Sequence, residues 1–169
     1  GNNSTTNLIN FSDKIFAIFK QEAKFYKRRG GNVYWVGHPM IDLTKKLPFK
    51  KDSRKILKLQ PNQNILLLMP ASRSQELKYI LPTFLKTAKQ LQLRYPSLVV
   101  FIPSCRRSFD EKLRKGLAKY GIKGKVISQK DDSELKPYIY SLTKLALCKS
   151  GTVNMELALY GIPQIVGYR

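Results

Sequence analysis

"NILLLMPASRSQELKYILPTFLKTAKQL", residues 64–91, is the stretch that decides the fold class of this chain. Its first seven residues form a continuous apolar run that ends at a proline, which is typical of a parallel strand buried on both faces. From Leu77 to Leu91 the apolar residues recur at gaps of three and four, so they share one face of a helix. Pro82 must lie in the first turn of that helix or kink it.

The same alternation of strand and helix continues from residue 92 to residue 168. Further strands are predicted at SLVVFIP, KVIS, KLALCKS and PQIVGY, and helices at SFDEKLRKGLAKYG, SELKPYIYSL and TVNMELALYG. Short connections between alternating strands and helices are typical of a doubly wound, Rossmann-like α/β domain with a parallel sheet. We therefore expect such a domain from about residue 62 onward.

The first sixty residues have a different organisation. Residues 1–10 are polar without a period and predict a loop, followed by a strand at 13–19, a helix at 20–31 and a strand at 33–36. Residues 1–40 are therefore interpreted as the tail of a preceding N-terminal α/β domain. Residues 41–61 contain Pro48 and several lysines, which predicts a linker with a short helix near residues 52–59. Residues 62–169 form the expected C-terminal domain, truncated at its end.

Charge and composition limit the classes of partner. Lys and Arg number 31 against 11 Asp and Glu, so the formal net charge is +20. This charge favours an anionic partner, which could be a nucleic acid, an anionic membrane surface or a phosphorylated substrate. Two cysteines without CxxC spacing and one histidine argue against a structural zinc site and suit a reducing, cytosolic compartment. No apolar run approaches the roughly 20 residues of a membrane span.

Two loops place small polar residues directly before a helix, at the carboxyl ends of predicted strands. They are MPASRSQE, with Ser72 and Arg73, and CKSGTVNME, with Ser150, Gly151 and Thr152. Ligands of open α/β sheets bind at these ends, and the unpaired N–H groups of a first helical turn attract anions. The loops therefore fit a diphosphate, although neither matches GxGxxG or Walker A. The alternative for each loop is a helix cap without a ligand.

Two further polar residues are candidates for a role. Glu156 lies four residues after Thr152 on the same helical face, so its carboxylate could accept two ribose hydroxyls next to the diphosphate. The alternative is a solvated helix carboxylate. His38, directly before Pro39, favours a structural or hinge role over a catalytic one.

Three motifs in order resemble those of the lipid-A-disaccharide synthases. LLMPASRSQEL resembles LLPGSRxxE, KSGTVNMELALYGIPQIVGYR resembles SGTxxLE followed by PVVxYR, and KQEAKFYKRRGGNVYWVGHPMID resembles PFExxFY followed by VGHPLxD. The resemblance covers nearly the whole chain. It implies a GT-B glycosyltransferase with two Rossmann-like domains, of which this chain would be the end of the first domain, the crossover and most of the nucleotide-binding second domain.

The resemblance also implies an activity. The family joins UDP-2,3-diacylglucosamine to 2,3-diacylglucosamine 1-phosphate, giving lipid A disaccharide 1-phosphate and UDP in lipid A and lipopolysaccharide biosynthesis. The UDP-sugar is a substrate, so no cofactor and no metal are expected. The enzyme works as a peripheral protein on the cytoplasmic face of the inner membrane, and no nucleic-acid partner is expected. The general base, an Asp of the N-terminal domain, would lie outside this chain, so the chain alone should lack transferase activity.

Site residues carry over by position. Ser72, Arg73, Ser150, Gly151, Thr152 and Glu156 match the donor-binding motifs, with Arg73 stabilising the leaving diphosphate. The hinge motif is matched by Gly37, His38, Pro39 and Asp42. There are three departures from the pattern. Ala71 replaces a glycine, which matters if the backbone there needs positive φ or close approach to a phosphate. Lys149 replaces a small residue, and Lys20-Gln21-Glu22 stands where Pro-Phe-Glu is usual.

Three alternatives to this function stay open. Another GT-B UDP-sugar transferase or a 2-epimerase would share the nucleotide loops and differ in the acceptor half. A basic nucleic-acid-binding α/β domain would explain the net charge of +20, but the charges do not cluster into a motif. The third alternative is a non-catalytic homologue. The sequence gives no indication of oligomeric state.

Overall fold

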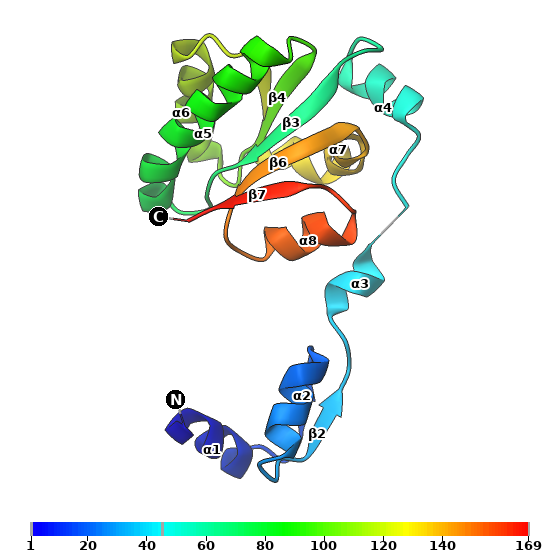
Figure 1. Ribbon diagram of the computed structural model, residues 1–169, viewed down its shortest axis with the longest axis vertical. Helices are drawn as coiled ribbons and strands as arrows, with labels where there is room; N and C mark the ends of the chain where they lie inside the picture. Colours follow the sequence, from blue (N-terminus) through cyan, green and yellow to red (C-terminus); the bar gives the residue numbers. More distant parts are fainter. Residues whose placement is uncertain (1, 45, 169) are drawn as a thin grey trace. The chain divides into compact units, whose positions relative to one another are not determined.

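The computed structural model describes residues 2–44 and 46–168, and the chain divides into two compact units between residues 45 and 46. Figure 1 shows the elements of each unit in sequence order. Each unit has its own parallel sheet: two strands in the first unit and five in the second. The predicted α/β class with a parallel sheet is confirmed.

The first unit is built around a βαβ element. Strands β1 and β2 pair in parallel, with Ile15 opposite Val33, and α2 connects them. Helix α1 precedes this element, so the expected loop over residues 1–10 is wrong for residues 2–10. The reason is a tertiary contact, because the half-buried Ile9 lies against Gly31 beside β2. The elements are α1 (Asn2–Phe11), β1 (Ile15–Ala17), α2 (Lys20–Lys27), β2 (Val33–Trp35) and α3 (Pro39–Leu43).

The second unit is a doubly wound sheet with strand order β5-β4-β3-β6-β7, parallel at every pairing. Strand β3 is central and lies between β4 and β6, where the direction of winding reverses. Its elements are α4 (Lys50–Leu57), β3 (Asn64–Met69), α5 (Ser74–Arg94), β4 (Leu98–Pro103), α6 (Arg107–Lys119), β5 (Gly124–Ile127), α7 (Gln129–Leu142), β6 (Thr143–Lys149), α8 (Val153–Leu159) and β7 (Gln164–Gly167).

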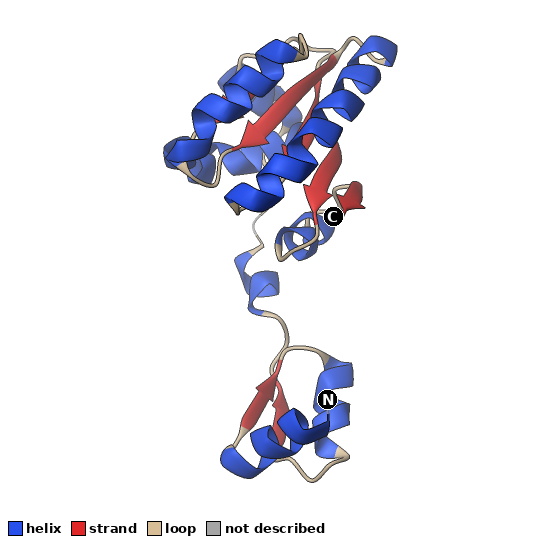
Figure 2. Ribbon diagram, turned by 90° about the vertical axis from the view of Figure 1, so that its left-hand side faces the viewer, coloured by secondary structure: helices blue, strands red, loops and turns tan. Residues whose placement is uncertain are grey.

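Helices cover both faces of this sheet, as Figures 1 and 2 show. Leu66 and Leu68 of β3 point to one face and pack in a cluster with buried side chains of α5 and α6. Ile65 and Leu67 point to the other face and pack with residues of α4, α7 and α8. Successive residues of β3 thus enter different clusters, which explains why its sequence is apolar without alternation.

Helix α4 lies inside the predicted linker of residues 41–61 but packs with the second unit. Leu57 is buried in the cluster beneath α7, and the hydroxyl of Ser141 in α7 donates a 2.6 Å hydrogen bond to that of the buried Ser53. A short helix was expected near residues 52–59, and α4 covers most of that range. The chain therefore divides nearer residue 45 than residue 62.

Helix α5 runs unbroken from Ser74 to Arg94, with Pro82 in its interior rather than in its first turn. Pro82 has no N–H to donate to the carbonyl one turn earlier, but it lies on the exposed side of the helix. Leu81 and Phe84, on the other side, stay buried. None of the helices in the described part of the chain has the length and apolar character to cross a membrane.

Candidate functional site

A cleft of about 340 Å³ opens at the carboxyl ends of β3 and β6. These neighbouring strands are the point where the winding of the sheet reverses, which is where open α/β sheets bind ligands. The two loops singled out in the sequence both line it. The lining residues are Met69, Pro70, Ala71, Ser72, Arg73, Glu76, Pro103, Cys105, Lys149, Ser150, Gly151, Thr152 and Val153.

The first loop leads from β3 into α5 and carries Ser72 and Arg73 at the rim of the cleft. Arg73 is the N-cap residue of α5, and no side chain caps this helix. Its guanidinium lies 4.0 Å from Glu76 Oε1 and is largely exposed. Ala71 does not have positive φ, and its side chain packs against the core. The φ angle at this position therefore does not require the glycine that the motif carries there.

The second loop leads from β6 into α8 and is fixed by its own hydrogen bonds. The Ser150 N–H donates to Gly167 O at 3.3 Å, and the Gly151 N–H donates to Asn154 Oδ1 at 2.7 Å. The backbone N–H groups of Thr152 and Val153 have no backbone acceptor among the described residues. These two N–H groups and the hydroxyl groups of Ser150 and Thr152 are the polar groups of this loop, whose residues 150–153 line the cleft.

Asn154 organises the second loop through its side chain, and the sequence analysis did not single it out. Its Nδ2 donates to Gln164 Oε1 at 2.9 Å and to Cys148 Sγ at 3.0 Å, and Gln164 Nε2 donates back to the Asn154 carbonyl at 2.9 Å. These bonds join the end of β6, the start of α8 and strand β7. The spacing of Asn154, three residues after Gly151, was the available signal, because a polar residue at this distance often bonds the loop before a helix.

Lys149 and Glu76 form an ion pair across the cleft. Lys149 Nζ lies 2.6 Å from Glu76 Oε1, and both side chains are largely buried. Lys149 ends β6 and Glu76 lies in the first turn of α5, so the pair connects the two loops. Lys149, which replaces the small residue of the family motif, is thus part of the cleft wall.

Glu156 is not among the residues that line the cleft, and its side chain forms an ion pair between α8 and α7. Its Oε1 lies 3.3 Å from Lys136 Nζ, and the same lysine is 3.9 Å from Asp132 Oδ2. Burial raises the pKa of Asp132, Lys136 opposes this, and Glu156 adds to it. Burial likewise raises the pKa of Tyr140, with Glu156 as the next cause. The described ion-pair partner of Glu156 is therefore Lys136 of α7.

Cys105 contributes a thiol to the wall of the cleft. It follows β4, and burial together with the negative charge of Asp132 raises its pKa, so the thiol form is favoured. Within the described ranges, no three His, Cys, Asp or Glu side chains gather in a group that could hold a metal ion. The polar groups of the cleft are hydroxyls, backbone N–H groups and cations, which together suit an anionic ligand.

Comparison with known proteins assigns the family. A family model described as lipid-A-disaccharide synthetase matches residues 2–169. The chain belongs to this family. The lipid-A-disaccharide synthase of Prochlorococcus marinus (strain MIT 9313) is 49% identical over 169 residues, which are 100% of this chain and 43% of that protein. That of Gloeothece citriformis (strain PCC 7424) is 37% identical over 98% of this chain and 42% of its own length.

The chain thus spans about two fifths of the length of these lipid-A-disaccharide synthases. A solved structure also resembles it: the C-terminal domain of a glycosyl transferase group 1 family protein from Francisella tularensis. The TM-score is 0.53 at 14% identity, over 75% of this chain and 68% of that one. At this identity the likeness shows the fold alone, and it agrees with the expected glycosyltransferase half.

The third motif that resembles the lipid-A-disaccharide synthetase family lies in the first unit at residues 20–42, and its last part, GHPMID, is residues 37–42. His38 Nδ1 accepts a 3.2 Å hydrogen bond from the Met40 N–H and so caps α3, whose first residue is Pro39. Gly37 has φ of +79°, a conformation that favours glycine. Asp42 is exposed in the first turn of α3. The observed contacts of His38 are those of a helix cap.

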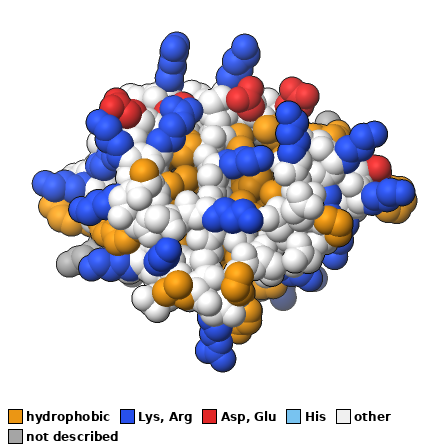
Figure 3. Space-filling view, turned by 90° about the horizontal axis from the view of Figure 1, so that it is seen from above, with side chains coloured by type: hydrophobic (Ala, Val, Ile, Leu, Met, Phe, Trp, Pro, Cys, Tyr) orange, Lys and Arg blue, Asp and Glu red, His pale blue; other side chains and the backbone are white. Residues whose placement is uncertain are grey.

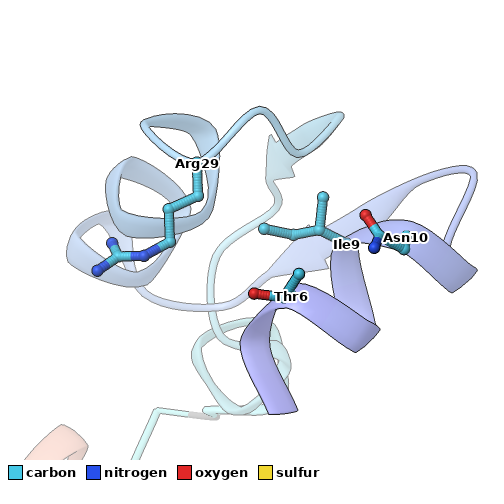
Figure 4. Close-up of a pocket in the computed structure, with 4 residues that line it drawn as sticks. All are labelled: Thr6, Ile9, Asn10 and Arg29. Atoms are coloured by element: carbon cyan, nitrogen blue, oxygen red, sulfur yellow. The ribbon is translucent and has the colours of Figure 1, made fainter. Parts of the chain in front are cut away.

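The first unit also contains a cavity of about 360 Å³, lined by Thr6, Ile9, Asn10 and Arg29. Figure 4 shows that Thr6, Ile9 and Asn10 come from α1 and Arg29 from the segment after α2. The Arg29 guanidinium stacks 3.7 Å from the centre of the Phe25 ring, so its charge is engaged within the unit. Of these four residues only Arg29 lies within the third motif segment, residues 20–42, and we assign no ligand to the cavity.

Basic side chains are widely distributed on the surface. Figure 3 shows Lys and Arg spread over the whole visible face, with only a few acidic side chains among them. The helices add unbalanced charge, because several exposed lysines of α4 and α6 have no acidic partner among the described ion pairs. This distribution suits general attraction to an anionic surface rather than one shaped site.

Proposed function

We propose that this chain supplies the donor-binding half of a glycosyltransferase that joins UDP-2,3-diacylglucosamine to 2,3-diacylglucosamine 1-phosphate. The products are lipid A disaccharide 1-phosphate and UDP. One observation carries the proposal: two motif loops of a lipid-A-disaccharide synthetase family member meet around one cleft at the reversal point of the sheet. In such folds this place receives the phosphates of a nucleotide.

In this proposal the diphosphate lies between the two loops. Ser72, Ser150 and Thr152 offer hydroxyl donors, and the Thr152 and Val153 N–H groups face the ligand. Arg73 can turn its exposed guanidinium toward the phosphate oxygens, since only the 4.0 Å contact with Glu76 holds it. These groups recognise charge and shape at one end of the nucleotide.

Glu156 binds the ribose in this proposal. It lies in α8 after the second loop, where a carboxylate would not meet the phosphates, and its Oε1 is 3.3 Å from Lys136 Nζ. An ionised carboxylate only accepts hydrogen bonds and can take two hydroxyl donors. This role requires Glu156 to exchange or share its contact with Lys136 when the nucleotide binds.

The chemical step follows from the bond that breaks. The 6-hydroxyl oxygen of the acceptor attacks the anomeric carbon of the donor, the bond between that carbon and the diphosphate breaks, and UDP leaves with the electron pair. Arg73 and the loop donors stabilise the negative charge that develops on the diphosphate. The hydroxyl proton passes to a base that we place outside residues 1–169, in the part of the enzyme that binds the acceptor.

The substrates and their membrane also suit the positive charge. Both lipid substrates are anionic and lie in a bilayer, and a basic surface is attracted to anionic lipids. We propose peripheral binding on the cytoplasmic face of the inner membrane, where a UDP-sugar is available. The wide distribution of Lys and Arg in Figure 3 supports such an attraction.

A chimera tests the proposed activity. This chain would replace the matching 43% of the Prochlorococcus marinus relative, with which it is 49% identical. We expect UDP release that depends on both lipid substrates, and loss of that release on Arg73→Ala. A folded chimera that binds both substrates without turnover would contradict the proposal and favour a non-catalytic homologue. The chain alone should give no turnover.

A further inference from the structure

Lys149 is a basic residue in the described lining of the cleft that the proposed function does not use. It is the last residue of β6, directly before the loop of residues 150–152, and it lines the cleft. Its side chain is largely buried, and its Nζ is anchored 2.6 Å from Glu76 Oε1. The resemblance pattern has a small residue at this position, so the lysine is a property of this chain.

Charge in the cleft depends on this residue. The charged side chains of the lining are Arg73, Glu76 and Lys149, two cations and one carboxylate. Without Lys149, Glu76 would balance Arg73 and the lining would carry no net charge to attract a diphosphate. With Lys149 the lining carries a net charge of one positive unit. A partly buried cation is screened less by salt than one on the open surface.

Glu76 holds Lys149 in a position from which it can reach both loops. Glu76 is fixed in the first turn of α5, a place that favours a carboxylate, and its Oε2 is buried without a hydrogen-bond partner among the described residues. The lysine ammonium has three donors and uses one of them on Glu76. Two donors remain for a ligand between α5 and residues 150–152.

We propose that Lys149 binds the diphosphate of the nucleotide directly, with Glu76 as the residue that positions it. The inference rests on the proposed function and adds a second cation beside Arg73. Lys149 thereby makes the cleft prefer a nucleoside diphosphate over the bare nucleoside, and it stabilises the charge on the leaving UDP.

The test compares UDP with uridine on the 169-residue chain and its variants. Amide-proton NMR titrations give the dissociation constants and show that each protein is folded. Lys149→Met removes the charge, Lys149→Arg retains it, and Lys144→Met is the matched control. Lys144 is exposed on the same strand, five residues before Lys149 and about 17 Å away at the usual rise of a strand. Lys149→Gln, which can still donate to Glu76, replaces Lys149→Met if that variant unfolds.

We expect Lys149→Met to weaken UDP binding about tenfold or more and uridine binding by less than about twofold. Lys149→Arg should retain most of the preference for UDP, and Lys144→Met should behave as the parent chain. Equal losses for UDP and uridine would show that the ion pair only shapes the cleft and would overturn the inference. Unchanged UDP binding by folded Lys149→Met would overturn it too, while the proposed function would stand. If the folded parent chain does not bind UDP, both the inference about Lys149 and the proposed function are contradicted.

Discussion

Asn154 Oδ1 accepts a 2.7 Å hydrogen bond from the Gly151 N–H and thereby fixes the loop between β6 and α8. The same amide group bonds Gln164 of the neighbouring strand β7. The shape of the proposed diphosphate loop therefore depends on the side chain of the second residue of α8 and on β7, the strand that follows this helix.

Replacing this amide should loosen the loop. Asn154→Ala leaves the Gly151 N–H without its acceptor and removes one donor to Gln164 Oε1, so we expect a loss of about 1–3 kcal/mol in the free energy of unfolding. UDP affinity should fall as well. Urea unfolding and UDP titration measure the two effects, with Gln90→Ala on the exposed side of α5 as the control. Stability and affinity equal to those of the parent would contradict this role.

The ribose role of Glu156 predicts a second effect on binding. Glu156→Ala should weaken UDP binding by roughly 1–3 kcal/mol, as expected for loss of a hydrogen bond to a charged group. Glu134→Ala, on the exposed side of α7, should leave the affinity unchanged. Calorimetric titration at physiological salt measures both. If Glu156→Ala binds UDP like the parent, Glu156 serves only as the ion-pair partner of Lys136.

Asp132 predicts an unusual dependence of stability on pH. Burial raises its pKa in the folded state above the ordinary value of 3.8, so the folded chain binds its proton more tightly than the unfolded chain. At low pH this carboxyl therefore stabilises the folded chain. Its contribution to the free energy of unfolding is lost as pH rises from about 3.8 through the raised folded pKa. The Asp132→Asn variant does not ionise and should gain stability relative to the parent over this window.

Urea unfolding at pH 4 and pH 7 checks this sign. The difference in unfolding free energy between Asp132→Asn and the parent should favour the variant more at the higher pH. Glu134→Gln on the same helix is the control and should show no such trend. If Asp132→Asn instead loses stability relative to the parent as the pH rises, the contact of Asp132 with Lys136 has a larger effect on the pKa of Asp132 than burial has.

Helix α4 should behave as part of the second unit rather than as a linker. Leu57 is 4% exposed beneath α7, so Leu57→Ala should lower the unfolding free energy by about 2–4 kcal/mol. Its neighbour Ile56 is 44% exposed, and Ile56→Ala should cost well under half as much. A chain that begins at residue 46 should keep the stability of the second unit, and one that begins at residue 62 should lose much of it. Equal stability of the two would contradict this assignment.

The sheet of the second unit was predictable from local sequence, and its polar contacts were not. The apolar run of β3 and the three-and-four spacing of α5 each follow from burial of a single element. The pair of Lys149 with Glu76 joins residues 73 positions apart, and the bond of Asn154 with Gln164 needs β7 beside β6. Such contacts depend on strand order, which no single segment encodes. Helix α1 was missed for a similar reason, since its contact with Gly31 is tertiary.

The central claim is that the cleft between α5 and the loop of residues 150–152 binds UDP. Its most direct test is calorimetric titration of UDP into the folded 169-residue chain at physiological salt, with circular dichroism to establish folding. The account predicts weak, saturable binding of one UDP, reduced by Arg73→Ala. A folded chain that gives no binding at millimolar UDP would contradict it and leave the two loops as helix caps.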